Sequence, residues 1–299
     1  MEIDVYGVPL DYGSGRRGVD MGPSAIRYAG LLQGLGQLKH VVRDCGNLEM
    51  PITENTPEGD PRLKHLNAVL PVVQRLADQV ANSVSEGRVP LVLGGDHSLA
   101  LGSVAGACRH RRLGVLWLDA HGDFNTQDTT PSGNIHGMPL AALCGLGDER
   151  LVTLGGADPN GAKVDPRNVA IIGARSLDDQ EKILLRDAGV GVYSMDAIDR
   201  MGMAEVMHRA MENVSQDTDG IYVSLDLDAV DPMFAPGVGT PVAGGMTFRE
   251  AHLAVELVAE TGKLVGMDVV ECNTILDTMN QTAQLAVQLI LSAFGKRIW

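Results

Sequence analysis

The sequence predicts an α/β fold: a single three-layer α/β/α domain that spans residues 1–299 around a central, mostly parallel β-sheet. Short aliphatic runs alternate with longer amphipathic stretches along the chain, which is typical of βαβ units. The aliphatic runs are nearly continuous rather than alternating, as strands buried on both faces require. No repeat, low-complexity tract or linker divides the chain, so we expect one domain.

The predicted elements follow one another in a regular order. Runs rich in Val, Leu and Ile predict strands at residues 2–8, 89–93, 114–118, 169–172, 221–225 and 264–270. Apolar residues at helical spacing predict helices at 24–35, 66–84, 181–188, 204–214, 248–261 and 281–294. Pro71 lies in the second of these helices, where it marks a first turn or a kink. Glycine, proline and polar residues predict loops at 11–23, 47–61, 125–139 and 232–245.

Composition and charge narrow the function classes. The formal net charge is −14, from 38 acidic and 24 basic residues. This balance argues against nucleic acid or an anionic membrane as a partner, and it suits a cationic substrate, although solvated acidic helix faces also produce such an excess. Four scattered cysteines without CxxC spacing indicate side chains that are reduced, buried or incidental rather than joined in disulfides. No secretion signal is visible and no apolar run approaches the ~18 residues of a membrane span, so we expect a cytoplasmic protein.

Charged residues directly follow three of the predicted strands. These motifs are Gly94-Gly95-Asp96-His97, Asp119-Ala120-His121-Gly122-Asp123 and Asp226-Leu227-Asp228. The carboxyl ends of parallel strands share one edge of a sheet, which is where open α/β folds bind ligands. Asp119, His121 and Asp123 are spaced two residues apart, so an extended backbone would point all three to one side. The sequence therefore predicts that these side chains converge.

The chemistry of this set indicates a metal site. Four converging carboxylates would repel one another, and burial would raise their pKa values, whereas two divalent cations balance their formal charge. The set combines four aspartates with two imidazoles, His97 and His121, and contains no thiolate. Zinc, magnesium and calcium each favour a different donor set. Mixed oxygen and nitrogen ligands favour manganese(II), with cobalt, nickel or iron as substitutes in vitro.

Each motif has a simpler explanation when it is taken alone. Asp-x-His-x-Asp occurs in capped turns and surface ion clusters, Gly-Gly-Asp-His in ordinary strand-to-helix turns, and a lone aspartate pair also binds magnesium or caps a helix. The three motifs together, each after a buried strand, favour a metal site. A two-metal phosphatase would need basic residues near these ligands, and the sequence has none there. No phosphate-binding loop or Gly-x-Ser-x-Gly motif is present either.

The three motifs resemble the signatures of the ureohydrolase (arginase/agmatinase) family, and the similarity extends over essentially the whole chain. The matching segments are 94–98 (GGDHS), 119–123 (DAHGD) and 224–232 (SLDLDAVDP). The resemblance implies a hydrolase that binds two Mn²⁺ ions per subunit. It implies that the ligands of these ions are His97, Asp119, His121, Asp123, Asp226 and Asp228, with some carboxylates bridging.

The same resemblance implies a site for L-arginine. Asn125, Ser132 and Asn134 lie in segments similar to the substrate loop of arginases and would contact the α-carboxylate. Asp178 lies in a stretch similar to bacterial arginases, where the aspartate helps to hold the α-amino group. It is also a candidate N-cap of the helix that follows, and Asn, Ser and Gly are common in any loop.

Three further residues complete the site that the resemblance implies. Thr240 and Glu271 match residues that line the guanidinium site, and His136 resembles a histidine that shuttles a proton beside the metals. In this hypothesis a metal-bridging hydroxide attacks the guanidinium carbon, Glu271 orients the substrate, and His136 supplies a proton to the leaving amine. The products are L-ornithine and urea. Asp123 is counted with His136 and Glu271 among the expected catalytic residues.

Other functions stay open at this point. Agmatinase, guanidinobutyrase and formimidoylglutamate hydrolase belong to the same family, and only the resemblance of the substrate loop argues against them. A non-catalytic metal-binding homologue is the alternative from another class. Members of the family form trimers or hexamers, and Arg249-Glu250 resembles an intersubunit pair, so we expect a homo-oligomer.

Overall fold

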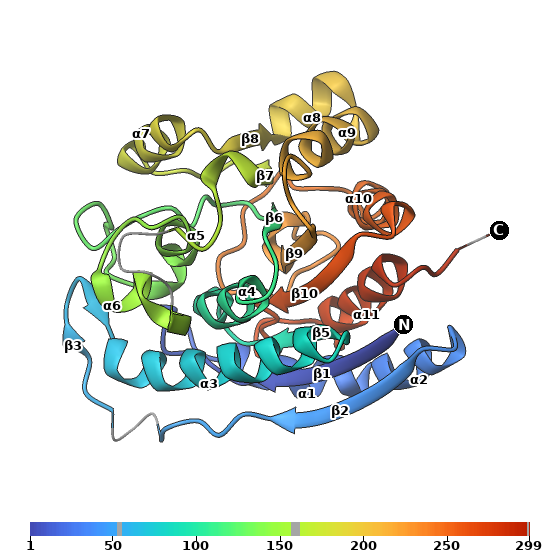
Figure 1. The fold of residues 1–299 in the computed structure, drawn as a ribbon, viewed down its shortest axis with the longest axis horizontal. Helices are drawn as coiled ribbons and strands as arrows, with labels where there is room; N and C mark the ends of the chain where they lie inside the picture. The colour runs from blue at the N-terminus through green and yellow to red at the C-terminus, as the bar shows by residue number, and fades with distance from the viewer. Residues whose placement is uncertain (53–55, 157–161, 298) are drawn as a thin grey trace.

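The computed structural model describes residues 1–52, 56–156, 162–297 and 299, and a parallel β-sheet forms its centre (Figure 1). Eight strands lie in the order β2-β1-β5-β10-β9-β6-β7-β8, and each neighbouring pair is parallel. Their bounds are β1 Glu2–Val8, β2 Val41–Asn47, β5 Val89–Gly94, β6 Leu113–Leu118, β7 Val169–Ala174, β8 Gly191–Ser194, β9 Gly220–Asp226 and β10 Leu264–Val270. Two short strands, β3 (Gly59–Asp60) and β4 (Leu63–Lys64), pair antiparallel outside this sheet.

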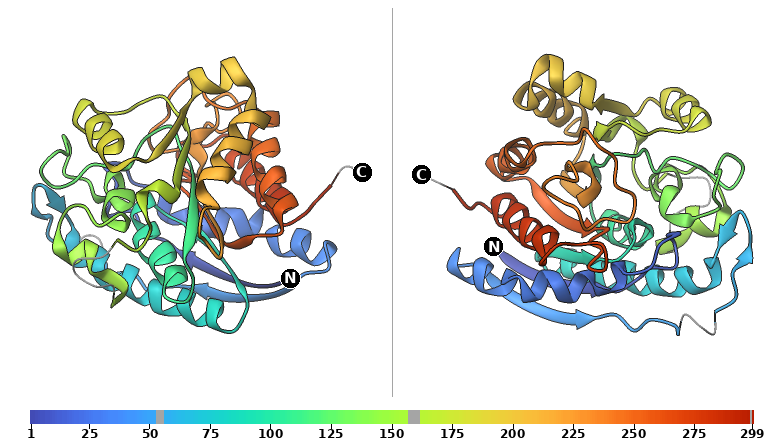
Figure 2. Two further views of the ribbon diagram at one scale, coloured as in Figure 1. Left: turned by 45° about the horizontal axis from the view of Figure 1, so that its top comes forward. Right: turned by 180° about the vertical axis from the view of Figure 1, so that it is seen from behind.

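Helices cover both faces of the sheet (Figure 2). One hydrophobic cluster packs one face against α3 Leu66–Ser85, α4 Ala100–Cys108, α5 Pro139–Leu143, α6 Glu149–Val152 and α7 Asp179–Ala188. A second cluster packs the other face against α1 Gly22–Tyr28, α2 Leu31–Gln37, α8 Met195–Met201, α9 Met203–Val214, α10 Phe248–Thr261 and α11 Gln281–Ala293. The predicted α/β fold with three layers is therefore confirmed.

All six predicted strands are present, each within one or two residues of its predicted bounds. The sequence prediction misses β2 and β8, which form the two edges of the sheet, because their residues are mostly exposed or half-buried and contain no long aliphatic run. It also misses α4, which is buried on almost every side and so has little helical periodicity. The short helices α5, α6 and α8 are missed as well.

The predicted helix at 24–35 is two helices, α1 and α2. Gly30 separates them with a φ of 95°, a left-handed conformation that glycine adopts without the steric cost of a side chain. The predicted helix at 66–84 is present as α3, which continues past Pro71. The sequence pattern at 24–35 therefore predicts one helix where the chain turns at Gly30 and forms two.

The order of the strands brings the three charged motifs together. The motifs follow β5, β6 and β9, which with β10 occupy the centre of the sheet, so the carboxyl ends of these strands are neighbours. The predicted loops at 125–139 and 232–245 reach the same edge: His136 lies 3.1 Å from Glu271, which follows β10, and the Thr240 hydroxyl donates to Asp228. In the part of the chain that the structure describes, no helix has both the length and the apolar character that crossing a membrane needs.

Candidate metal and substrate site

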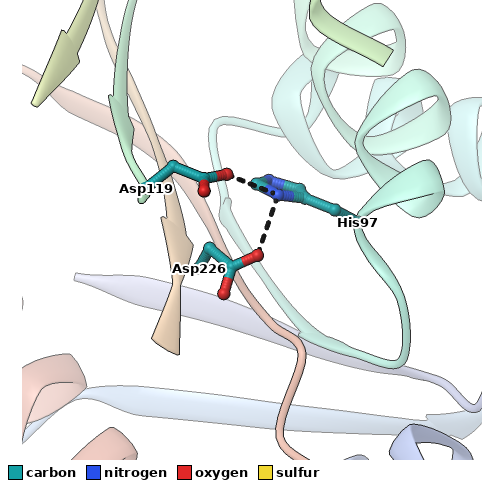
Figure 3. Close-up of side chains that lie close together, drawn as sticks. All are labelled: His97, Asp119 and Asp226. Carbon is teal, nitrogen blue, oxygen red and sulfur yellow. Dashed lines mark ion pairs between the residues drawn. The ribbon is translucent and has the colours of Figure 1, made fainter. Parts of the chain in front are cut away.

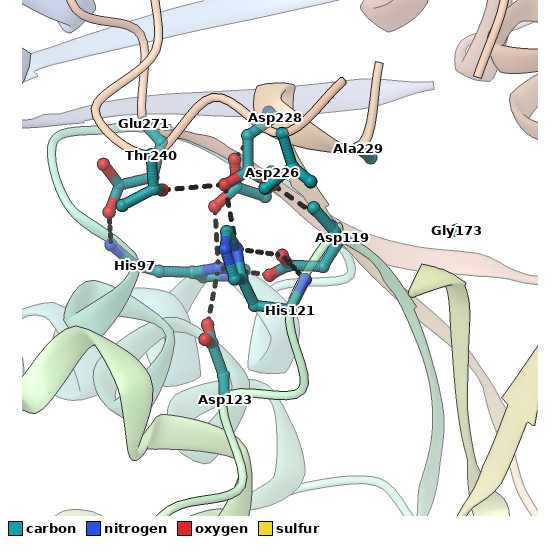
Figure 4. Close-up of polar contacts among 12 residues, drawn as sticks. His97, Asp119, His121, Asp123, Gly173, Asp226, Asp228, Ala229, Thr240 and Glu271 are labelled. Atoms are coloured by element: carbon teal, nitrogen blue, oxygen red, sulfur yellow. Dashed lines mark hydrogen bonds and ion pairs between the residues drawn. The ribbon is translucent and has the colours of Figure 1, made fainter. Parts of the chain in front are cut away.

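Six acidic and imidazole side chains converge at the carboxyl ends of the central strands (Figure 4). They are His97 after β5, Asp119, His121 and Asp123 after β6, and Asp226 and Asp228 at the end of β9. All of them except His121 are buried. The convergence that the strand ends predict is therefore present. Buried charges at this density need compensating charges or hydrogen bonds.

The Nδ1 atom of His97 lies at the centre of the first group (Figure 3). Carboxylate oxygens of Asp119, Asp123 and Asp226 lie 3.1, 3.0 and 3.3 Å from it. Nevertheless, this buried nitrogen has no hydrogen-bond partner among the described residues, because none of the three oxygens meets the required geometry. Three carboxylate oxygens around one buried nitrogen form a ligand set that a metal cation could share.

His121 forms a second group with Asp119 and Asp228. Its Nδ1 lies 3.0 Å from Asp228 Oδ2 and 3.4 Å from Asp119 Oδ1. Asp119 presents its other oxygen, Oδ2, to His97. One ligand atom from each of His97, Asp119 and Asp226 lies within 4.8 Å of the others, and the same holds for Asp119, His121 and Asp228. Two adjacent groups that share a carboxylate have the layout of a two-metal site.

Backbone amides orient these carboxylates without neutralising their charge. The amide of His121 donates to Asp119 Oδ1 at 2.7 Å, and the amide of Asp228 donates to Asp226 Oδ1 at 2.7 Å. The amide of Ala120 donates to Asp228 Oδ1 at 3.1 Å and so links the ends of β6 and β9. The Asp-x-His and Asp-x-Asp spacings therefore have a local reason, since each first aspartate accepts from the amide two residues later.

The pKa values show the excess of negative charge in this cluster. Burial and neighbouring carboxylates raise the pKa of Asp226 well above its usual range, and they raise that of Asp123 to about 6. Burial lowers the pKa of His97, but the surrounding aspartates outweigh this effect and raise it well above its ordinary value. The same balance raises the pKa of His121 to about 12. Sites that attract protons this strongly also attract divalent cations.

The donor set fits a hard or borderline divalent cation. Such ions bind oxygen ligands at about 2.0–2.6 Å, so ligands at right angles in a six-coordinate site lie about 2.8–3.7 Å apart. The distances around His97 Nδ1, from 3.0 to 3.3 Å, fall in this range. Four carboxylates with two imidazoles and no thiolate suit manganese better than a structural zinc ion.

A second row of side chains lies beneath the ligand groups, and sequence reasoning missed it. Strand register aligns Trp117, Ser224 and Asp268 across β6, β9 and β10. Trp117 and Ser224 precede the two strand-end aspartates by two residues and therefore face the same side of the sheet. The Trp117 ring stacks on His97 with centroids 4.1 Å apart, and its Nε1 donates to Asp119 Oδ2 at 3.0 Å.

Glu271 follows β10 with a φ of 63°, in the left-handed region that residues other than glycine seldom adopt. Its Oε1 accepts from the backbone amide of His97 at 3.0 Å and lies 3.1 Å from His136 Nδ1. Its Oε2 is buried and has no hydrogen-bond partner within the described ranges. Burial lowers the pKa of His136, but Glu271 outweighs this effect and raises it to about 9.

A pocket opens beside the ligand groups and contains most of the predicted substrate contacts. Its lining includes His121, Asp123, Asn125, Ser132, His136, Asp178, Asp226 and Thr240. Asn134 lines an adjoining pocket together with His136, Thr240 and Glu271. The structure thus places every predicted substrate-contact residue around the same end of the sheet.

Asp178 both caps a helix and lines the pocket, so its position is compatible with both of the roles considered for it above. It is the N-cap residue of α7, and Glu181 Oε2 accepts from its backbone amide at 3.2 Å. Its own Oδ2 accepts from Asn125 Nδ2 at 2.9 Å, within the pocket lining. Glu181, which sequence reasoning missed, also lines the pocket, and burial raises its pKa to about 7. From the sequence alone, Glu181 is expected only to cap the helix, because it stands three residues after the N-cap residue Asp178.

Comparisons with known proteins agree with this geometry. The model of the arginase family matches residues 1–295. The arginases of Bacillus caldovelox and Bacillus subtilis are each 50% identical to this chain; the matches cover 99% of the chain and 99% and 98% of the relatives, respectively. The solved structure of the Bacillus caldovelox enzyme has a TM-score of 0.95 at 50% identity and 99% coverage of both chains, and that of Bacillus cereus arginase has 0.94 at 50% identity and 100% coverage. A family match over nearly the full length, with relatives this similar from end to end, shows that the chain belongs to the arginase family.

Proposed function

We propose that this protein is a manganese-dependent arginase that hydrolyses L-arginine to L-ornithine and urea at a two-metal site. The observation that carries the proposal is the pair of histidine–aspartate groups that share Asp119. Next to these groups lies Glu271, whose buried Oε2 has no hydrogen-bond partner among the described residues. Relatives that are 50% identical over almost the whole chain are arginases, which supports the same substrate here.

Six side chains would hold the ions, with Asp119 shared between the two groups. They are His97, Asp119, His121, Asp123, Asp226 and Asp228. When bound, a pair of such ions neutralises the carboxylates and supplies a nucleophilic water at neutral pH. Backbone amides donate hydrogen bonds to the carboxylates of Asp226 and Asp228. These bonds and the shared carboxylate of Asp119 hold the ligands in place before any ion binds.

Glu271 provides the anionic partner for the guanidinium group. The amide of His97 holds Oε1, so the carboxylate keeps one orientation, and the unpartnered Oε2 can accept from guanidinium N–H groups. Thr240 Oγ1 donates to Asp228 Oδ2 at 2.9 Å, which leaves the oxygen lone pairs of Thr240 available to a second N–H group. Together these contacts would orient the guanidinium plane beside the metal ligands.

His136 is placed to deliver a proton to the departing nitrogen. It lines both the substrate pocket and the adjoining pocket that contains Glu271. Glu271 raises the pKa of His136 to about 9 despite burial, which favours a protonated ring at neutral pH. Nδ1 faces Glu271, so Nε2 is the atom that can donate. Its side chain is 18% exposed, which lets solvent replace the proton.

The far end of the pocket suits an amino acid rather than a simple amine. The Asp178 carboxylate can hold an α-amino group, while Asn125, Ser132 and Asn134 offer neutral donors to an α-carboxylate. The Ser132 side chain is exposed at the pocket lining, where a substrate can reach it. Agmatine has no carboxylate and could not use these donors. This difference favours arginase over agmatinase. Guanidinobutyrate has a carboxylate but no α-amino group, so it could not use Asp178, which favours arginase over guanidinobutyrase as well.

Three broader expectations remain proposals of ours. We infer one domain over residues 1–299, a cytoplasmic location, and a homo-oligomer that is a trimer or a hexamer. Arg249 pairs with Glu256 at 3.2 Å in the same chain, and Glu250 belongs to the capping box of α10. An intersubunit role for Arg249 and Glu250 would therefore share or replace these contacts.

The test is urea release from L-arginine, with agmatine assayed in parallel, after loading with Mn²⁺ and again after chelation. We expect urea from L-arginine alone, its loss on chelation, and its return with Mn²⁺. Urea from agmatine instead would keep the two-metal reaction but contradict the roles of Asn125, Ser132 and Asn134. No urea from any guanidino substrate would favour a non-catalytic metal-binding homologue.

A further inference from the structure

A buried carboxylate lies beneath the ligand groups, where neither the metal ions nor the substrate would touch it. Asp268 in β10 is fully buried. Ser224 Oγ donates to its Oδ1 at 2.6 Å, and Ser103 Oγ of α4 donates to its Oδ2 at 2.6 Å. An acid in the middle of an aliphatic strand is costly to bury, and the proposed reaction does not use it directly. Its place in the hydrogen-bond chain suggests what it does.

The hydroxyl of Ser224 connects Asp268 to His97. Ser224 Oγ lies 2.8 Å from His97 Nε2. A serine hydroxyl has a single proton, and here that proton is donated to Asp268, so the oxygen can only accept from Nε2. His97 must therefore carry a proton on Nε2. Its Nδ1, which has no hydrogen-bond partner among the residues described, is then the nitrogen that can present a lone pair to an ion.

We propose that Asp268 is a positioning residue: by holding the proton of Ser224, it fixes the tautomer of His97 that binds metal. The inference rests on the proposed function, because it requires a metal ion at His97. Trp117 fixes the plane of the same ring by stacking on it at 7°. Stacking cannot choose between the two nitrogens, whereas the hydrogen-bond chain can.

The opposite arrangement shows why the choice matters. Without an acceptor at position 268, the Ser224 hydroxyl could turn and donate to His97 Nε2. That bond favours a proton on Nδ1, which points at the oxygens of Asp119, Asp123 and Asp226. A proton there would occupy the position of the ion, and metal binding would have to remove it.

Two substitutions of Asp268 distinguish the loss of the hydrogen-bond acceptor from the loss of the negative charge. Asp268→Leu removes the acceptor at similar size, so we expect it to weaken Mn²⁺ binding about 10–100-fold, the usual effect of losing such an outer partner. Asp268→Asn removes the charge but keeps an oxygen that can accept from Ser224, while its NH₂ group donates to Ser103. We expect its Mn²⁺ affinity to stay close to that of the unmodified protein. The measurement is the dissociation constant of Mn²⁺ by equilibrium dialysis with atomic absorption.

Matched controls sharpen the result. Ser103→Ala removes a hydrogen bond from the same carboxylate but leaves Ser224 donating to it, so Mn²⁺ affinity should not change. Ser224→Val breaks the chain, and adding Asp268→Leu to it should cause no further loss, because Asp268 acts through Ser224. Equal losses in Asp268→Asn and Asp268→Leu would overturn the inference, as would additive losses in the double variant.

The protonated nitrogen of the ring can also be identified in protein that keeps Asp268 and Ser224. In ¹⁵N-histidine-labelled protein loaded with diamagnetic Zn²⁺, the His97 signals should show a proton on Nε2, and His97→Asn identifies those signals. A proton on Nδ1 would contradict the inference. The two proposals also fail differently. Unmodified protein that binds no Mn²⁺ would contradict the proposed function, whereas Mn²⁺ binding that is insensitive to Asp268→Leu would overturn only the role of Asp268.

Discussion

Replacing Glu271 by glutamine tests the proposed substrate contact with a change of nearly constant size. The amide oxygen can still accept from the backbone amide of His97, as Oε1 does at 3.0 Å. The NH₂ group then stands where the buried, unpartnered Oε2 stands in the described structure. A guanidinium ion would meet a donor in place of an anionic acceptor. Both the charge and the direction of the hydrogen bond are lost in one step.

The expected size of the effect follows from this geometry. Removing one partner of a buried, hydrogen-bonded charge pair costs about 3–5 kcal/mol, because the remaining charge stays buried without compensation. Glu271 is 1% exposed, so solvent cannot replace it. At about 1.4 kcal/mol for each factor of ten, we expect kcat/KM for L-arginine to fall roughly 10²–10⁴-fold.

The assay combines urea release at several L-arginine concentrations with manganese content by atomic absorption. Manganese content should not change, because Glu271 belongs to neither ligand group. Glu205→Gln is the matched control: Glu205 lies in α9, its side chain is 44% exposed and it pairs with Arg209, so this substitution should leave both readings unaltered. Unaltered activity in Glu271→Gln would refute the proposed contact. Loss of manganese in the same variant would show that Glu271 acts through the metal site instead.

Other substitutions test separate parts of the structure. His97→Asn should lower the manganese content of the purified protein, and an unchanged content would remove His97 from the ligands. Ser132→Ala should raise KM for L-arginine roughly threefold to tenfold with little change in kcat, as expected for one lost hydrogen bond; an unchanged KM would contradict the contact. Gly95→Ala would place a Cβ 1.8 Å from a backbone carbonyl oxygen, and thermal unfolding should show a loss of at least about 3 kcal/mol. Arg88→Met removes a 2.6 Å hydrogen bond to buried Asp4 and should cost about 1–3 kcal/mol in urea unfolding. Burial raises the pKa of Asp4, but its arginine and serine partners outweigh this and lower it, so the contribution of Arg88 is present above pH 3.8 and is lost as the pH falls below it.

The fold could be predicted from the sequence wherever burial marks an element. The six strands with continuous aliphatic runs lie in the middle of the sheet or next to it, and their bounds are nearly right. The edge strand β2 contains Arg43 and Asp44 and is almost wholly exposed, so its residues show no strand pattern. Helix α4 is missed for the opposite reason: its residues are buried on almost every side, so their hydrophobicity shows little helical periodicity. Elements at the extremes of burial therefore lack a signal in the sequence.

The residues of the candidate site likewise divide into those that the sequence predicts and those that only the fold reveals. The motifs at the strand ends could be found because each is a short run of charged residues after an aliphatic run. Ser224 and Asp268 lie inside strands and are 44 residues apart in the sequence, so only the register of β9 against β10 makes them neighbours. The acid in the run 264–270 was a usable signal, since a buried charge needs partners. Its partners could not be named without the strand order.

The backbone at the site shows what the chemistry requires of the chain. Asp123 and Glu271 have positive φ values of 49° and 63°, a conformation that costs an L-residue about 1–2 kcal/mol. Glycine would relieve this strain at either position, but it would remove a carboxylate that the proposed reaction needs. Tertiary hydrogen bonds hold both turns: the amide of Glu271 donates to Gly95 O at 2.8 Å, and Asp123 O accepts from the amide of Leu140 at 3.1 Å. The side-chain requirement therefore outweighs the backbone preference at these two positions, which is the pattern expected where strain is kept for function rather than for stability.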